Sequence, residues 1–161
     1  KEQITKNITS LFLLDKNFNI INKKIMDIDF DNRRYIGIED IRIFENENNE
    51  LVFIGTGYHK NETIGIVTGN YDIDNGKLNP IELKQTFNNS GCEKNWVFIN
   101  YNNSTHVVYD WNPLKICKIN HENRLDIVET KKMPSIFSRV RGSTCGFTYS
   151  KKIGSNNNGT N

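Results

Sequence analysis

The stretch at 37–42, G-I-E-D-I-R, places two acids and an arginine at the start of an apolar strand pattern. Strict alternation along a strand sends Asp40 and Arg42 to one face and Glu39 to the other. A carboxyl group near an arginine at the mouth of a pocket suits proton transfer or the orientation of hydroxyl groups. We therefore take Asp40 as a candidate catalytic acid, and Glu39 and Arg42 as candidate substrate contacts. A buried arginine–carboxylate pair that ties two strands together is the structural alternative.

A second charged stretch, C-E-K-N-W at 92–96, sets a cation, an amide and a large ring in succession. Lys94 could receive an anionic group such as phosphate as a point charge. Asn95 and Trp96 would then contact the rest of the same ligand. The alternative is that Trp96 belongs to the core and Lys94 is a solvated surface charge.

Two further stretches interrupt the strand pattern with polar groups. Y-D-W-N-P-L at 109–114 contributes Asp110, Trp111 and Asn112 as candidate substrate contacts. R-V-R-G-S-T-C-G at 139–146 contributes Arg141 and a run of small residues whose backbone amides could cradle an anion. A plain tight turn is the alternative for this last stretch.

The rest of the chain reads as short β-type runs separated by turn residues. Five hairpins are predicted, with turns near 16–17, 46–50, 74–76, 102–103 and 121–123. Asparagine, aspartate and glycine supply the backbone angles that these turns need. No segment has a sustained helical period with caps, so we predict an all-β fold and no long helix. Hairpins in this rhythm fit a sandwich, a barrel or a propeller.

Composition narrows the classes of partner. The 21 lysines and arginines are dispersed along the chain and nearly balance 19 acids, a formal charge of +2. Nucleic-acid binding depends on clustered positive charge, so we do not expect it. No apolar stretch approaches the roughly 20 residues that span a bilayer. The polar segment 149–161 is expected to be a disordered tail behind a single domain, 1–148.

Cysteine and histidine give no metal pattern. Cys92, Cys117 and Cys145 are widely spaced and are interpreted as reduced, structural thiols. The three histidines are far apart in the sequence and are interpreted as surface or packed residues, so no metal and no cofactor are predicted.

Taken in order, the four polar stretches resemble the inverting β-mannoside phosphorylases and related propeller-type mannosyltransferases, which are five-bladed β-propellers. G-I-E-D-I-R is similar to the family's G-[IV]-E-D-P-R segment, with Ile41 in place of proline, and C-E-K-N-W is similar to its [DE]-K-N segment. The resemblance covers roughly residues 30–148. It implies antiparallel four-stranded sheets as blades, Asp40 as the general acid and Lys94 as an anion-binding residue.

The departures from the family pattern alter the expected reaction. Where the phosphorylases carry a basic His-Arg-Pro stretch that helps to hold phosphate, this chain has Trp111-Asn112-Pro113. Ordinary glycoside hydrolysis uses two carboxylates, and only one obvious acid is present. We therefore expect glycosyl transfer with a single general acid, either mannosyltransferase-like, from a sugar phosphate or a nucleotide sugar, or mannoside-phosphorylase-like. A non-catalytic module that binds glycans on Tyr109, Trp96 and Trp111 is the alternative, and a purely structural role for the four stretches is a third.

Length sets a limit on the propeller. Five blades need around 300 residues, at about 40 per blade plus loops. The 161 residues hold about ten to twelve predicted strands, or about two and a half to three blades at four strands each. We expect a partial propeller, with missing blades or self-association completing the ring.

Overall fold

The computed structural model describes residues 5–30, 35–88 and 90–147, and this part of the chain is all-β. The prediction of an all-β fold without a long helix is confirmed, since the described residues contain thirteen strands and one short 3-10 helix, Ser135–Arg139. No helix here is long and apolar enough to cross a membrane. The predicted tail, 149–161, lies outside the described residues.

The first large sheet is an antiparallel meander with one added strand. β6 (Glu39–Glu45), β7 (Leu51–Tyr58), β8 (Ile64–Asp72) and β9 (Lys77–Glu82) follow one another in space as in sequence. The short β4 (Asp27–Ile28) pairs in parallel with β9, so the sheet has five strands where four were predicted.

The second large sheet has the predicted four antiparallel strands. It runs in order through β10 (Val97–Tyr101), β11 (Ser104–Trp111), β12 (Leu114–Ile119) and β13 (Leu125–Lys131). Its first turn shows why asparagine is so frequent in this chain, because Asn102 and Asn103 both have positive φ angles, 51° and 59°. Two-residue hairpin turns of this kind require such angles, which asparagine tolerates.

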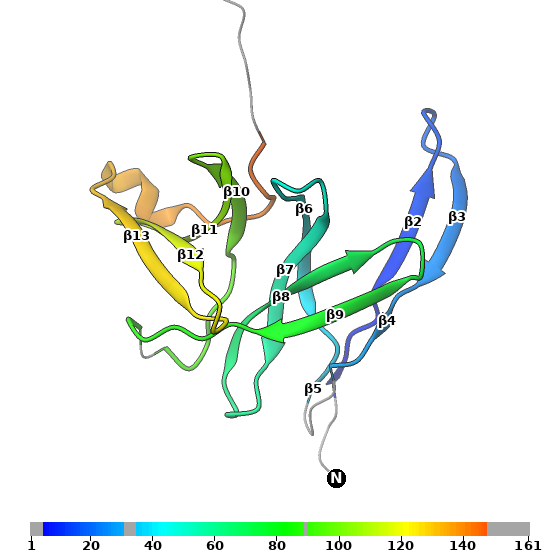
Figure 1. The fold of residues 1–161 in the computed structure, drawn as a ribbon, viewed down its shortest axis with the longest axis horizontal. Helices are drawn as coiled ribbons and strands as arrows, with labels where there is room; N and C mark the ends of the chain where they lie inside the picture. The colour runs from blue at the N-terminus through cyan, green and yellow to red at the C-terminus, as the bar shows by residue number, and fades with distance from the viewer. Residues whose placement is uncertain (1–4, 31–34, 89, 148–161) are drawn as a thin grey trace, which may run out of the picture.

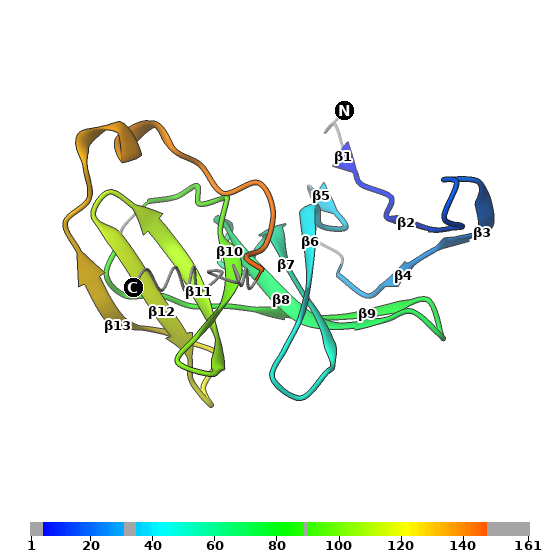
Figure 2. The same cartoon turned by 90° about the horizontal axis from the view of Figure 1, so that it is seen from above.

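The N-terminal part forms two smaller units. β2 (Ser10–Leu14) and β3 (Ile20–Ile25) make the first predicted hairpin, which lies at one end of the molecule in both views (Figures 1 and 2). β1 (Thr5–Lys6) and β5 (Tyr35–Ile36) form a parallel pair. All five predicted hairpins are therefore confirmed, and the sheets do not close into a barrel within the described residues.

Both faces of the first large sheet are covered. One face, with Ile54 and Ile66, packs against Phe98 and Val107 of the second sheet in a shared core. The opposite face, with Phe53, joins a separate cluster formed mainly with residues of β4, β8, β9 and the segments before β4 and β6. Alternate residues of β7 thus serve two different cores, as expected of a strand buried on both faces.

Candidate functional site

A β-bulge at the start of β6 decides where the first acidic stretch points. Glu39 and Arg42 pair with residues 56 and 54 of β7, so residues 40 and 41 together face Gly55. Asp40 has a φ of 52°, a left-handed conformation that aspartate adopts more readily than most residues. The predicted alternation is wrong, because the extra residue places Glu39 and Arg42 on the same face of the sheet. Glu39 and Asp40 are both exposed.

Gly55 makes the bulge sterically possible. A Cβ atom at this position would lie 2.7 Å from Ile38 Cγ2 and 2.9 Å from the carbonyl oxygen of Glu39. Contacts this short do not occur, so a larger residue would push the bulged segment off β7. The orientation of Asp40 therefore depends on a glycine on the neighbouring strand.

Arg42 joins the first stretch to the small-residue stretch at 139–146. Its Nε donates to the carbonyl oxygen of Ser143 at 3.1 Å, and its Nη2 donates to that of Gly142 at 3.2 Å. Its Nη1 donates to the carbonyl oxygen of Asp40 at 3.2 Å. The structural alternative, a buried arginine–carboxylate pair, is not found within the described residues, where Arg42 takes part in no ion pair and donates to carbonyl oxygens instead.

The lysine-containing stretch reaches the same junction through its backbone. A Cβ atom on Gly142 would lie 2.3 Å from the carbonyl oxygen of Asn95, so these two segments are in close contact. Asn95 has a φ of 72°, which turns the chain into β10. Three of the four polar stretches are thus linked in series, 39–42 to 141–143 through the Arg42 side chain and 141–143 to 94–95 through the close approach of Gly142 to Asn95. We call this grouping the Arg42 junction (residues 39–42, 94–95 and 141–143).

Side chains at the junction differ in accessibility. Lys94 and Arg141 are exposed. Trp96 is only 3% exposed and belongs to the core shared by the two sheets. Its burial favours the packing interpretation over a sugar-stacking surface.

The fourth stretch, 109–114, lies on the β11–β12 hairpin. Asp110 pairs with Lys115 at 3.4 Å and accepts a hydrogen bond from the Asn112 backbone N–H at 3.3 Å. The indole nitrogen of Trp111 is buried and has no hydrogen-bond partner in the described part of the chain. Among the described residues, the hydrogen bonds and the ion pair of Asp110 and Asn112 therefore stay within their own hairpin.

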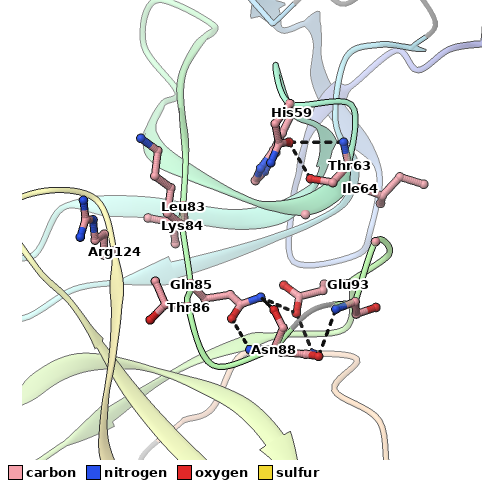
Figure 3. A pocket seen from close by; sticks show the side chains of 14 residues that line it. His59, Thr63, Ile64, Leu83, Lys84, Gln85, Thr86, Asn88, Glu93 and Arg124 are labelled. Carbon is pink, nitrogen blue, oxygen red and sulfur yellow. Dashed lines mark hydrogen bonds between the residues drawn. The ribbon is translucent and has the colours of Figure 1, made fainter.

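A polar cavity of about 550 Å³ lies between the start of β8 and the segment that connects β9 to β10 (Figure 3). Figure 3 shows Lys84 and Arg124 on one side of it and Glu93 on the other. Amide, hydroxyl and carboxyl side chains predominate in its wall, including those of Asn61, Thr63, Gln85, Thr86, Asn88, Ser90 and Glu93. We call it the Glu93 cavity.

One carboxylate oxygen of Glu93 accepts three hydrogen bonds from neighbouring side chains. Its Oε1 accepts from Asn88 Nδ2 at 2.8 Å, from Gln85 Nε2 at 3.1 Å and from the Tyr109 hydroxyl. Burial raises the pKa of Glu93 above its ordinary value, and the hydrogen bonds from Tyr109 and Asn88 offset part of that rise. Burial also raises the pKa of Tyr109, so this phenol remains a donor. A carboxyl group held in this way is suited to exchange a proton or to bind a hydroxyl group.

Glu93 is not among the site residues predicted from the sequence, although the three residues that follow it are. The glutamate of C-E-K-N-W was the available signal, and it was interpreted only as part of a motif. Gln85 and Asn88 gave no signal, because they lie in a connection without strand periodicity. Both side chains donate hydrogen bonds to the Glu93 carboxyl group, as does Tyr109 from strand β11.

Three hollows with some lining residues in common lie around Asp40, Glu39 and Glu93. Asp40 and Glu39 line an open depression together with Asn7. Glu39 and Asn7 also line a small cavity that extends to Ile64, and Ile64 in turn lines the Glu93 cavity. Asp40 and Glu93 therefore line separate hollows with no lining residue in common, and both hollows share lining residues with the small cavity.

Within the described residues, the cysteines and histidines form no metal site, although His59 lines the Glu93 cavity (Figure 3). The three cysteines are free. His106 is buried, and His59, also buried, has its Nε2 2.9 Å from the carbonyl oxygen of Ile66. In the described part of the chain, no three histidine, cysteine or acidic side chains gather into a group that could hold a metal ion.

Glu93→Gln is expected to flatten the pH dependence of stability. A carboxyl group whose pKa is raised by folding stabilises the protein at low pH, and this contribution is lost as pH rises from 4.5, the ordinary value, through the raised pKa. Urea unfolding of both proteins at pH 4 to 8 should therefore show the wild type losing stability relative to the variant across that window. Glu45→Gln, on an exposed residue of β6, is the control. Parallel curves for wild type and Glu93→Gln would contradict the prediction.

Comparison of the chain with protein-family models, with curated proteins and with solved structures gives no match.

Proposed function

We propose that the protein is carbohydrate-active, is built on the plan of a partial β-propeller, and transfers a glycosyl unit. Propeller blades are four-stranded antiparallel meanders arranged around a central channel. Two consecutive meanders, β6–β9 and β10–β13, fit this plan. Their first strands, β6 and β10, line one groove together with residues 144–147, as inner strands of neighbouring blades would.

The observation that carries the proposal is the Glu93 carboxyl group in its polar cavity. A cavity of about 550 Å³ has the size of small-ligand sites, and its wall offers amides, hydroxyls and one acid. Sugar hydroxyls both donate and accept hydrogen bonds, so they match such a wall. Since Oε1 of Glu93 already accepts three hydrogen bonds from the protein, Oε2 is the oxygen that would meet a sugar hydroxyl.

In the proposed reaction, Asp40 acts on the reacting hydroxyl. The carboxylate takes the proton of the acceptor hydroxyl, whose oxygen forms the new bond to the anomeric carbon. The bond from that carbon to the phosphate oxygen of the donor breaks, and its electron pair leaves with the phosphate. Lys94 and Arg141, both exposed beside the Arg42 junction, would place the anionic part of the donor.

Saccharide binding tests the proposal. Calorimetry with mannose and short mannosides should show binding to the wild type. Glu93→Gln should bind about tenfold more weakly, because a hydrogen bond to a charged group is replaced by one to a neutral amide. Glu45→Gln should bind as the wild type does. Absence of binding to every mannoside would refute a mannoside site in the Glu93 cavity.

A non-catalytic glycan-binding module is the second candidate. The observation in its favour is that Asp40 and Glu93 line separate hollows. Binding that persists in Asp40→Ala, without turnover in the wild type, would favour this module over the transferase.

A further inference from the structure

Thr56 carries a buried hydroxyl group without a partner. The residue is 5% exposed, and its Oγ1 has no hydrogen-bond partner within the described residues. Thr68 on the adjacent strand shows the usual situation, since its Oγ1 donates to the carbonyl oxygen of Phe53 at 2.6 Å. Buried hydroxyl groups are nearly always hydrogen-bonded, so an unpartnered one indicates a group supplied from outside the chain.

Thr56 lines the small cavity, which shares lining residues with each of the two larger hollows. This cavity has a volume of about 30 Å³ and is also lined by Asn7, Glu39, Tyr58 and Ile64. The volume suffices for one water molecule or one hydroxyl group, but not for a sugar ring. The carboxyl group of Glu39 and the amide of Asn7, 3.4 Å apart, supply further polar atoms at its edge.

The position of the small cavity indicates what kind of ligand would fill it. It shares Asn7 and Glu39 with the Asp40 depression and Ile64 with the Glu93 cavity. A single sugar in the Glu93 cavity would leave the small cavity to water. A sugar chain that runs from the Glu93 cavity toward Asp40 would pass over it and could insert one hydroxyl group.

We infer that Thr56 is a specificity-determining residue that binds one hydroxyl group of an extended glycan, at least two sugar units long, lying between Glu93 and Asp40. This inference rests on the proposed function and names its substrate class as an oligosaccharide. The inserted hydroxyl replaces water and satisfies Oγ1 of Thr56. The hydrogen bond to Thr56 therefore raises the affinity for a disaccharide or a longer glycan and leaves the affinity for a single sugar unchanged.

Calorimetry with mannose, mannobiose and mannotriose tests this inference on wild type, Thr56→Val and Thr56→Ser. Thr56→Val should bind mannobiose and mannotriose about three- to tenfold more weakly, the usual effect of one neutral hydrogen bond. Mannose binding should be unchanged. Thr56→Ser keeps the hydroxyl group and should bind all three sugars as the wild type does.

Thermal unfolding supplies an independent readout without ligand. Thr56→Val should keep or raise Tm because no intramolecular hydrogen bond is lost, whereas Thr68→Val should lower it. A fall in Tm for Thr56→Val as large as that for Thr68→Val would show that Oγ1 has a partner in the protein, and would overturn the inference. Equal affinity of wild type and Thr56→Val for mannotriose would also overturn it. If the wild type binds none of the three sugars, the proposed function itself fails.

Discussion

Asp40→Asn should lower the rate of glycosyl transfer by about 10²- to 10⁴-fold, the usual contribution of a general acid or base. Asparagine has the shape of aspartate and tolerates the left-handed backbone conformation at this position, where φ is 52°. The amide cannot accept the proton of the acceptor hydroxyl. Transfer from mannose 1-phosphate or a nucleotide mannose to mannotriose measures the effect.

The matched control for this variant is Glu39→Gln, which changes the neighbouring exposed acid and leaves Asp40 in place. Its transfer rate should fall by much less. Tm of both variants should stay near that of the wild type, because both side chains are exposed. A normal transfer rate in Asp40→Asn would remove Asp40 from the reaction and leave glycan binding as the function to examine.

Arg42→Lys is expected to destabilise the protein by about 2 kcal/mol, the range for hydrogen bonds made by a charged group. The guanidinium reaches three carbonyl oxygens, those of Asp40, Gly142 and Ser143. A lysine ammonium is a point charge on a flexible chain and cannot replace this fork. Urea unfolding at constant pH measures the loss.

Arg139→Lys is the matched control for Arg42→Lys. Arg139 is exposed in the short 3-10 helix, so its replacement should leave the unfolding midpoint unchanged. If both variants unfold at the wild-type urea concentration, the Arg42 junction contributes nothing measurable to stability. The three stretches would then be neighbours without being held together by this side chain.

Much of the fold could be predicted because turn chemistry is local. Each hairpin turn carries its own residues, such as the Asn102–Asn103 pair, and these act whatever the rest of the chain does. The bulge at Asp40 could not be predicted, because it depends on Gly55 on the next strand. Likewise, two of the three carbonyl partners of Arg42, those of Gly142 and Ser143, lie about 100 residues away in sequence, and backbone atoms leave no mark in residue types.

The candidate site was predictable only where polar residues stand out against an apolar pattern. Asp40, Lys94 and Arg141 became candidates in this way, and the structure links their stretches through Arg42 and Gly142. Glu93 was not predicted because its hydrogen-bond donors include Tyr109, on strand β11, besides Asn88 of its own connecting segment. Thr56 looks like any strand threonine in the sequence, and only the absence of a partner around its buried hydroxyl distinguishes it within the described residues.

The core shared by the two large sheets also determines how the molecule would come apart. Ile54 and Ile66 of one sheet pack on Phe98 and Val107 of the other, so neither meander can separate without exposing this surface to water. The Glu93 cavity is lined by the connection between the two meanders, so we expect it to open only when the meanders unfold together. By contrast, the β2–β3 hairpin pairs with no other strand within the described residues. Its backbone amides can therefore exchange with solvent through local opening that leaves the cavity intact.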